Sequence, residues 1–344
     1  MCSFFVRSWF TASLLSRDVF ILSRGGSRMK KLGLLLLSLL LAAGVLSGCG
    51  QAQKPVEQQK QEKAAEAFPV TIKDASGQEV KIEKEPKKIV SLMPSNTEIT
   101  YALGLGKKVV GVTDFDTYPK EVKNVEKIGG MEFNTEKIIS LNPDLVLAHA
   151  SSMQSAKEGL KQLEDAGITV VTVNDAASFK EAYQSIEMIG KAAGAEDQAA
   201  SLIKGMKSDL ADIKEKAAGI SKDDQKKVFV EVSPAPDIYT TGKGTFMDEM
   251  LEAIHAENAA SAQKGWTKIT EEAIVKLNPD AIVTTNGKSA VSEIKKRSGW
   301  NGVKAVKNNE VYDVDPDLVT RPGPRLIKGV EELAEHIYPD VFKK

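Results

Sequence analysis

The sequence predicts an α/β protein of two similar lobes joined by a long helical segment. Three observations support this fold class. Short β-branched runs alternate with helical patterns, which is typical of βα units around a parallel sheet. One segment with a shared Leu-Asn-Pro-Asp turn occurs twice. A helical stretch rich in Ala, Lys and Glu separates the two series of strands.

The N-terminus has the pattern of a lipoprotein signal. An apolar run from Leu32 to Leu46 follows Met29 and two lysines, and it ends in Leu-Ser-Gly-Cys49. The run is short for a membrane span, which needs about 20 residues, but it suits the core of a signal peptide. The ending resembles the lipobox of bacterial lipoproteins, in which the chain is cut before a cysteine that then carries lipid. We expect residues 29–48 to be the signal peptide, Cys49 to be lipidated, and residues 1–28 to be an over-extended start.

The stretch that follows predicts a flexible tether. Residues 49–67 are mostly Gln, Lys, Glu and Ala, with almost no large apolar side chain to bury. Cleavage before Cys49 leaves this residue as the only cysteine, so neither a disulfide nor a catalytic thiol is expected. The protein is expected on the extracytoplasmic face of the cell membrane, held there by the lipid anchor alone.

Composition argues against several classes of function. The 344 residues include 46 basic and 47 acidic side chains, which gives no electrostatic footprint for nucleic acid. With two Cys and three His, a disulfide scaffold or a multi-Cys zinc module is excluded, and a zinc- or manganese-binding lipoprotein is disfavoured. The chain has no Gly-x-Ser-x-Gly and no Walker A motif. Gly242–Thr245 resembles a phosphate-binding loop only superficially, because the four-residue spacing before Gly-Lys is absent, and we interpret it as a strand-to-helix turn. We therefore expect no enzyme.

The first lobe is expected over residues 68–176. Alternating apolar and polar residues in 68–82 predict a hairpin that turns at Ser76-Gly77. The β-branched runs that follow predict a parallel sheet with strands at 89–92, 109–112, 145–147 and 169–171.

Linking helices are expected over 177–222 and the second lobe over 223–344. The helical pattern is interrupted near Gly194, and beyond it an apolar stripe predicts burial of one helix face. That stripe consists of Leu202, Ile203, Met206, Leu210 and Ile213. The second series of strands is expected at 228–230, 281–283 and 310–312.

The internal repeat aligns residues 134–148 with residues 270–284 without gaps. Asn134 or Thr270 can cap a short helix, and the Asn-Pro-Asp turn stops it. A buried strand then follows in each copy. The shared turn therefore indicates two related lobes.

At this point the chain resembles the substrate-binding proteins of ABC importers for cobalamin, ferric siderophores and haem. The resemblance covers about residues 69–344. It rests on both Leu-Asn-Pro-Asp turns and on the segments Ile89–Glu98, Gly129–Met131, Ala305–Tyr312 and Arg321–Arg325.

The resemblance implies two Rossmann-like lobes with parallel sheets and one long interlobe helix, as in class III periplasmic binding proteins. It also implies a ligand in the cleft between the lobes. The ligand would be a corrinoid or a ferric chelate, with haem as the alternative, and no resident cofactor is implied. The implied partners are a permease dimer and its ATPase subunits. The chain itself would be a monomer that delivers its ligand to the permease. A ligand sensor without a permease is a further alternative.

The resemblance gives Glu136 and Glu272 a role in docking onto arginines of the permease. A two-fold-related pair of acids would suit a symmetric basic surface. Alternatively, each acid merely stabilises the first turn of its helix through the helix dipole.

Ligand contacts are expected in loops that follow strands, where open parallel sheets place their ligands. Aligned by motif, six residues fall where the cobalamin-binding relative contacts its corrin: Phe115, His149, Tyr239, Trp266, Asp317 and Arg321. Each aromatic residue could instead belong to a lobe core, and His149 could be a non-ligand or an axial ligand to iron or cobalt. Trp300 is assigned to packing, and His255 and His336 to structural positions on helices.

Overall fold

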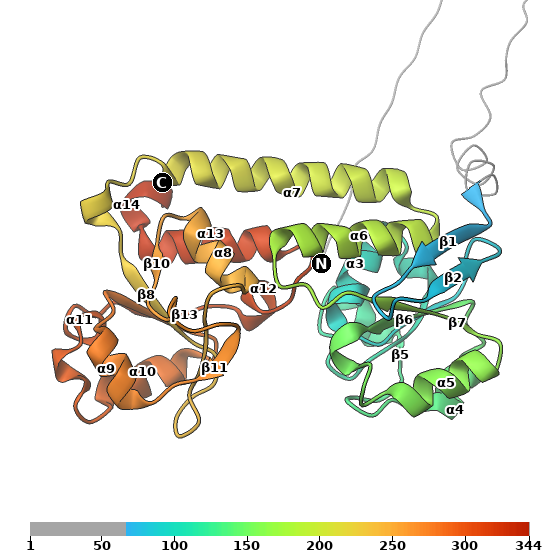
Figure 1. Cartoon of the computed structure of the whole chain (residues 1–344), viewed down its shortest axis with the longest axis horizontal. Coiled ribbons are helices and arrows are strands. Elements are labelled where there is room, and N and C mark those ends of the chain that lie inside the picture. The colour runs from blue at the N-terminus through green and yellow to red at the C-terminus, as the bar shows by residue number, and fades with distance from the viewer. Residues whose placement is uncertain (1–66, 344) are drawn as a thin grey trace, which may run out of the picture. The chain divides into compact units, whose positions relative to one another are not determined.

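The computed structural model describes residues 67–343, which form two α/β lobes connected by helices (Figure 1). The described residues all belong to a single compact unit. The expected signal peptide, Cys49 and nearly all of the tether lie outside the described residues. Within the part that is described, no helix is both long and apolar enough to cross a membrane.

The first lobe contains a parallel sheet of five strands in the order β5-β4-β3-β6-β7. Successive side chains of each strand point to opposite faces of the sheet, so each strand contributes to two apolar layers. Ile89 and Leu145 face α3 and the linking helix α6 (Phe179–Ala193), whereas Val90 and Val146 face α4 and α5. The elements are β3 (Ile89–Ser91), α3 (Pro94–Ala102), β4 (Val109–Val112), β5 (Glu126–Lys127), α4 (Thr135–Leu141), β6 (Leu145–His149), α5 (Lys157–Asp165) and β7 (Thr169–Val173).

The second lobe contains a parallel sheet of four strands in the order β10-β8-β12-β13. Val228 and Val283 face the linking helices, and Phe229 and Ile282 pack on the outer layer around the buried Trp300. The elements are β8 (Lys227–Glu231), α8 (Phe246–Ala253), β10 (Glu257–Asn258), α9 (Glu271–Leu277), β12 (Ala281–Thr284), α10 (Lys288–Lys296), α11 (Lys304–Lys307), β13 (Val311–Asp313), α12 (Pro316–Val319), α13 (Leu326–Ile337) and α14 (Pro339–Phe342).

Two antiparallel hairpins complete the strands. The predicted opening hairpin is confirmed as β1 (Val70–Lys73) and β2 (Glu79–Ile82). A second hairpin pairs β9 (Tyr239–Thr241) with β11 (Trp266–Lys268) in the second lobe. Gly77 has a φ of +85° in the first turn, a conformation that glycine adopts without strain.

The linking segment consists of α6 (Phe179–Ala193) and α7 (Glu196–Ala217). Gly194 ends α6 with a φ of +72°, which explains the predicted interruption. The 22 residues of α7 span about 33 Å, and the helix lies across both lobes (Figure 1). Its predicted stripe is buried except for the half-buried Leu202, so a single apolar core runs from one lobe into the other.

The two copies of the repeat form the same device. Asn134 and Thr270 cap α4 and α9 by accepting hydrogen bonds from the backbone three residues ahead. The carboxylate of Asp144 then accepts from the backbone N–H groups that precede β3, and that of Asp280 accepts from the first residue of β8. The repeated Leu-Asn-Pro-Asp turn thus ends a helix and anchors the neighbouring strand.

Candidate functional site

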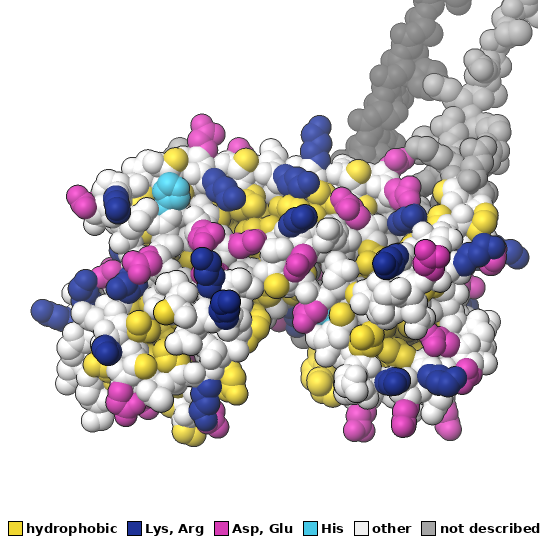
Figure 2. Space-filling view, in the orientation of Figure 1, with side chains coloured by type: hydrophobic (Ala, Val, Ile, Leu, Met, Phe, Trp, Pro, Cys, Tyr) yellow, Lys and Arg dark blue, Asp and Glu magenta, His cyan; other side chains and the backbone are white. Residues whose placement is uncertain are grey.

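A cavity of about 530 Å³ lies between the two lobes. Residues 93–95, 115, 149, 151 and 175–177 line it from the first lobe, and residues 244–246, 265–266 and 320–322 line it from the second. The first-lobe segments all lie at or just beyond the carboxyl ends of strands, where parallel sheets place ligands. Figure 2 shows the notch between the lobes, with apolar side chains on its rim.

Phe115 provides an exposed aromatic face on the first-lobe side. It follows β4, and half of its surface is exposed to solvent. Gly130 lies against it, and a Cβ atom at that position would come within 3.3 Å of the ring. The Gly-Gly-Met motif therefore leaves room for the ring at the mouth of the cavity.

Trp266 provides the corresponding face on the second-lobe side. It begins β11 and is 47% exposed, which is unusual for so large an apolar side chain. The buried Phe246 meets its ring edge to face, with centroids 5.9 Å apart. This contact orients the indole, so that two aromatic residues from different lobes line one cavity.

His149 ends β6 on the wall of the cavity and is buried. Its Nδ1 lies 2.8 Å from the Ser151 hydroxyl and accepts a hydrogen bond from the Ser151 backbone N–H. Burial lowers the pKa of His149, and the nearby Asp175 carboxylate offsets part of that effect. The imidazole is therefore neutral at pH 7.

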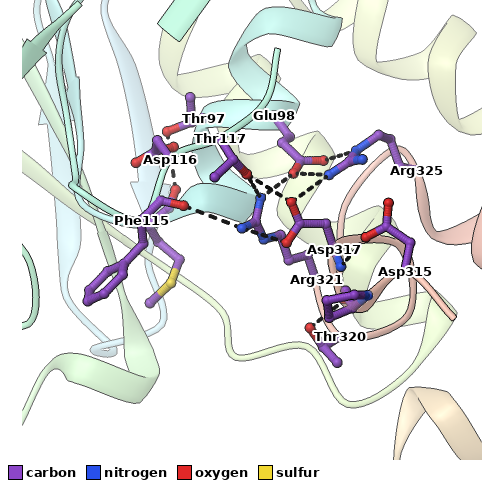
Figure 3. A network of polar contacts seen from close by, with 12 residues as sticks. Thr97, Glu98, Phe115, Asp116, Thr117, Asp315, Asp317, Thr320, Arg321 and Arg325 are labelled. Carbon is purple, nitrogen blue, oxygen red and sulfur yellow. Dashed lines mark hydrogen bonds and ion pairs between the residues drawn. The ribbon is translucent and has the colours of Figure 1, made fainter. Parts of the chain in front are cut away.

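A network of charged groups crosses between the lobes beside the cavity (Figure 3). Glu98, buried in α3, accepts a forked pair of hydrogen bonds from Arg325, both 2.7 Å long. Arg321, which lines the cavity, donates to the same carboxylate at 3.1 Å. Burying a carboxylate is costly unless it is paired, and here two arginines from the other lobe pair it.

The network continues through the loop after β4. Asp317 accepts from the Thr117 hydroxyl and forms an ion pair with Arg321, each at 2.8 Å. Arg321 also donates to the Phe115 carbonyl oxygen at 3.3 Å. The segment from Asp317 to Arg325 is thereby fixed against the loop that carries Phe115.

The cavity brings together four of the six predicted ligand contacts, which are Phe115, His149, Trp266 and Arg321. Asp317 does not line the cavity but holds Arg321. Tyr239 does not line it either and lies half exposed at the start of β9, in register with Lys268 rather than with Trp266.

Three charged residues of this region were missed by the sequence reasoning. Glu98 and Arg325 each end a segment that carries the family resemblance but were given no role, and Asp175 was not considered. The available signal for Glu98 was a run of polar residues, from Ser95 to Glu98, directly behind a buried strand. All of them are buried.

One structural assignment is wrong and one is confirmed. His255 does not lie on a helix, because α8 ends at Ala253 and His255 has a φ of +58° in the turn beyond it. His336 lies on α13, stacked on Tyr312. Among the described residues, no three His, Cys, Asp or Glu side chains gather in a way that could hold a metal ion.

Glu136 and Glu272 occupy equivalent, exposed positions in the first turns of α4 and α9. Hydrogen bonds from its own backbone N–H and from the Thr270 hydroxyl lower the pKa of Glu272, which keeps the carboxylate charged. Figure 1 places α4 and α9 at the lower ends of the two lobes, on the side opposite α7. Their position on the surface is compatible both with a docking role and with stabilisation of the helix dipoles.

The chain matches known proteins along most of its length. A family model described as periplasmic binding protein matches residues 89–318. The ABC transporter substrate-binding lipoprotein YvrC of Bacillus subtilis is 67% identical over 92% of this chain and all of its own length. The vitamin B12-binding protein of Vibrio parahaemolyticus is 27% identical over 73% of this chain and 89% of its own.

A solved structure shows the same architecture. It is described as a possible iron-binding, periplasmic solute-binding protein from Staphylococcus epidermidis. It is 43% identical, covers 74% of this chain and all of its own, and superposes with a TM-score of 0.68.

Proposed function

Because the chain belongs to the periplasmic binding protein family, we propose that it captures a metal chelate outside the cell and delivers it to an ABC importer. The observation that carries this proposal is the interlobe cavity, in which an aromatic face from each lobe meets a neutral histidine and an arginine. Aromatic faces suit a flat or bulky chelate, and a neutral imidazole can form a hydrogen bond with its peripheral polar groups. The B12- and iron-binding names of its relatives support this class of ligand.

The residues of the cavity suit a chelate better than a bare cation. A bare transition metal needs several converging nitrogen, sulfur or carboxylate ligands. Of the described residues that line the cavity, His149 and Asp175 are the only His, Cys, Asp or Glu side chains. A chelate brings its own ligand set and needs only shape and a few hydrogen bonds from the protein.

The proposal assigns the remaining parts of the chain to delivery. Cys49 would carry the lipid anchor, as the word lipoprotein in the name of the Bacillus relative suggests. Glu136 and Glu272 would contact a permease dimer whose ATPase subunits hydrolyse ATP. The chain itself would have no catalytic step.

The proposal predicts which aromatic residues control affinity. Full-length protein in detergent would be titrated calorimetrically with cyanocobalamin, haem and several ferric siderophores. For the compound that binds, Phe115→Ala and Trp266→Ala are each expected to weaken affinity at least about tenfold, because buried aromatic contacts dominate binding energy. Tyr239→Ala is the matched control, since Tyr239 is equally exposed but lies outside the cavity.

Two results would contradict the proposal. One is that no compound of the panel binds to the wild-type chain. The other is equal loss of affinity in all three variants, because this would place the ligand elsewhere or reflect general destabilisation.

A further inference from the structure

We propose that Glu98 sets the charge selectivity of the cleft. By neutralising the arginines there, Glu98 makes the cleft accept neutral chelates and reject multiply anionic ones. This inference rests on the proposed function and concerns the same cavity. It assigns a specificity role to a buried acid that does not itself line the cavity.

The first step is the charge balance of the cleft. Among the described residues that line the cavity, only Arg321 and Asp175 carry a formal charge, because His149 is neutral. The network behind Arg321 adds one cation, Arg325, and two anions, Glu98 and Asp317. Three carboxylates therefore accompany two guanidinium groups, and Asp315, which accepts from the Asp317 backbone, adds a further acid near Arg325.

Helix termini offset part of this excess. Residues 93–95 and 244–246, at the N-terminal ends of α3 and α8, line the cavity. Each N-terminus is equivalent to about half a positive charge, but Asp248 and Glu249 already lie in the first turn of α8. The site as a whole therefore carries no net positive charge.

The second step is the state of Arg321. Its Nη1 donates to Glu98 and to the Thr117 hydroxyl, and its Nη2 donates to the Phe115 carbonyl and pairs with Asp317. Both terminal nitrogens are thus used within the protein. A carboxylate of an anionic ligand would have to displace these partners and would then lie near two unpaired acids.

The third step is that the Glu98 carboxylate is held in place beside the cavity. Glu98 is 3% exposed and is held by a forked pair of bonds from Arg325. The guanidinium of Arg325 in turn lies 4.1 Å from the centre of the Tyr118 ring. The negative charge of Glu98 is therefore a fixed part of the cleft, and a neutral ligand meets no electrostatic penalty there.

The test changes this charge without changing shape. Full-length wild-type protein, Glu98→Gln and Asp317→Asn would be titrated with two neutral probes, cyanocobalamin and an iron(III) trihydroxamate. The same chains would be titrated with two anionic probes, iron(III) citrate and an iron(III) tris-catecholate. Glu215→Gln on the exposed face of α7 is the control for a charge removed elsewhere.

The wild-type chain is expected to bind a neutral probe at least tenfold more tightly than either anionic probe. Each cleft variant should strengthen binding of the anionic probes by about tenfold or more, as Coulomb's law gives for a unit charge about 8 Å away at an effective dielectric constant of about 20. Affinity for the neutral probe should change by less than about threefold, and added salt should reduce the gain.

The two ideas fail in different ways. If the wild-type chain binds an anionic probe as tightly as a neutral one, or if the variants leave the ratio unchanged, the role of Glu98 is wrong while the proposed function stands. If no probe binds any chain, the proposed function fails and this inference fails with it. Asp317→Asn gives the answer even if Glu98→Gln does not fold, because Asp317 is partly exposed.

Discussion

His149 lies on the wall of the cavity, where Ser151 contacts its Nδ1. Its Nδ1 lies against both the hydroxyl and the backbone N–H of Ser151, so Nε2 is the ring nitrogen available to a ligand. Nε2 can donate a hydrogen bond in one tautomer, and it can ligate a metal in the other, in which Nδ1 donates to the Ser151 hydroxyl. Both the hydrogen-bonding role and the axial-ligand role that the sequence left open therefore fit this position.

The lowered pKa of His149 predicts a pH dependence of stability. Its folded-state pKa lies below the unfolded value of about 6.5, so the unfolded chain takes up the proton first as the pH falls. Stability should therefore decrease from about pH 7 to about pH 5. Thermal unfolding of wild-type protein and His149→Gln would measure this, and the variant should lose less. Parallel curves for the two chains would contradict the assignment.

At the scale of elements, the sequence was informative wherever a local pattern reports burial. Seven strands of the two parallel sheets, the opening hairpin, the helix interruption at Gly194 and both copies of the repeat were predicted, because alternation and apolar periodicity follow directly from which face is buried. The short strands β5 and β10 and the hairpin of β9 with β11 were not predicted. The position of His255 was missed because a helix end depends on its cap, and no capping signal follows Ala253.

Two glycines of the linking segment predict opposite effects of the same substitution. Gly194→Ala should destabilise the protein by about 1–2 kcal/mol, because the residue has a positive φ and a Cβ atom would lie 3.0 Å from the Phe68 ring. Gly205→Ala should stabilise it by about 0.5–1 kcal/mol, because Gly205 is exposed within α7 with no atom nearby. Chemical denaturation would measure both.

The pair tests whether the break between α6 and α7 is built into the backbone. If Gly194→Ala were neutral or stabilising, the two helices could join without strain, and the account of the interruption would be wrong. Gly205→Ala controls for the general effect of replacing glycine in this segment.

At the scale of the whole molecule, the contacts between lobes were the part that sequence could not supply. Phe115, His149, Trp266 and Arg321 were predicted from the resemblance to the cobalamin-binding relative and, except for Trp266, from their position after strands of a parallel sheet. The ion pair of Glu98 with Arg325 joins residues 227 positions apart and leaves no periodic trace. Tyr239 and Trp266 lie on the paired strands β9 and β11. The register sets Tyr239 opposite Lys268 rather than Trp266, and only Trp266 lines the cavity.

The continuous core under α7 explains why the lobes can hold a preformed cleft. Apolar residues of α6, α7, α8 and α13 form one cluster that spans both lobes. The ionic network of Glu98 with Arg321 and Arg325 fastens the lobes at a second place. With two connections, we expect the lobes to move little on binding, so affinity depends on the residues that line the cavity.

Delivery to a permease depends on both lobes at once. The most direct test is uptake of the bound chelate by cells whose own copy is replaced by the full chain carrying Glu136→Lys and Glu272→Lys. We expect uptake near background, because the two acids would contact the permease. Ligand affinity should be unchanged, because both acids are exposed and lie outside the cavity. A control with Glu187→Lys and Glu215→Lys, exposed on α6 and α7, should transport normally. Normal uptake by the first variant would contradict the account.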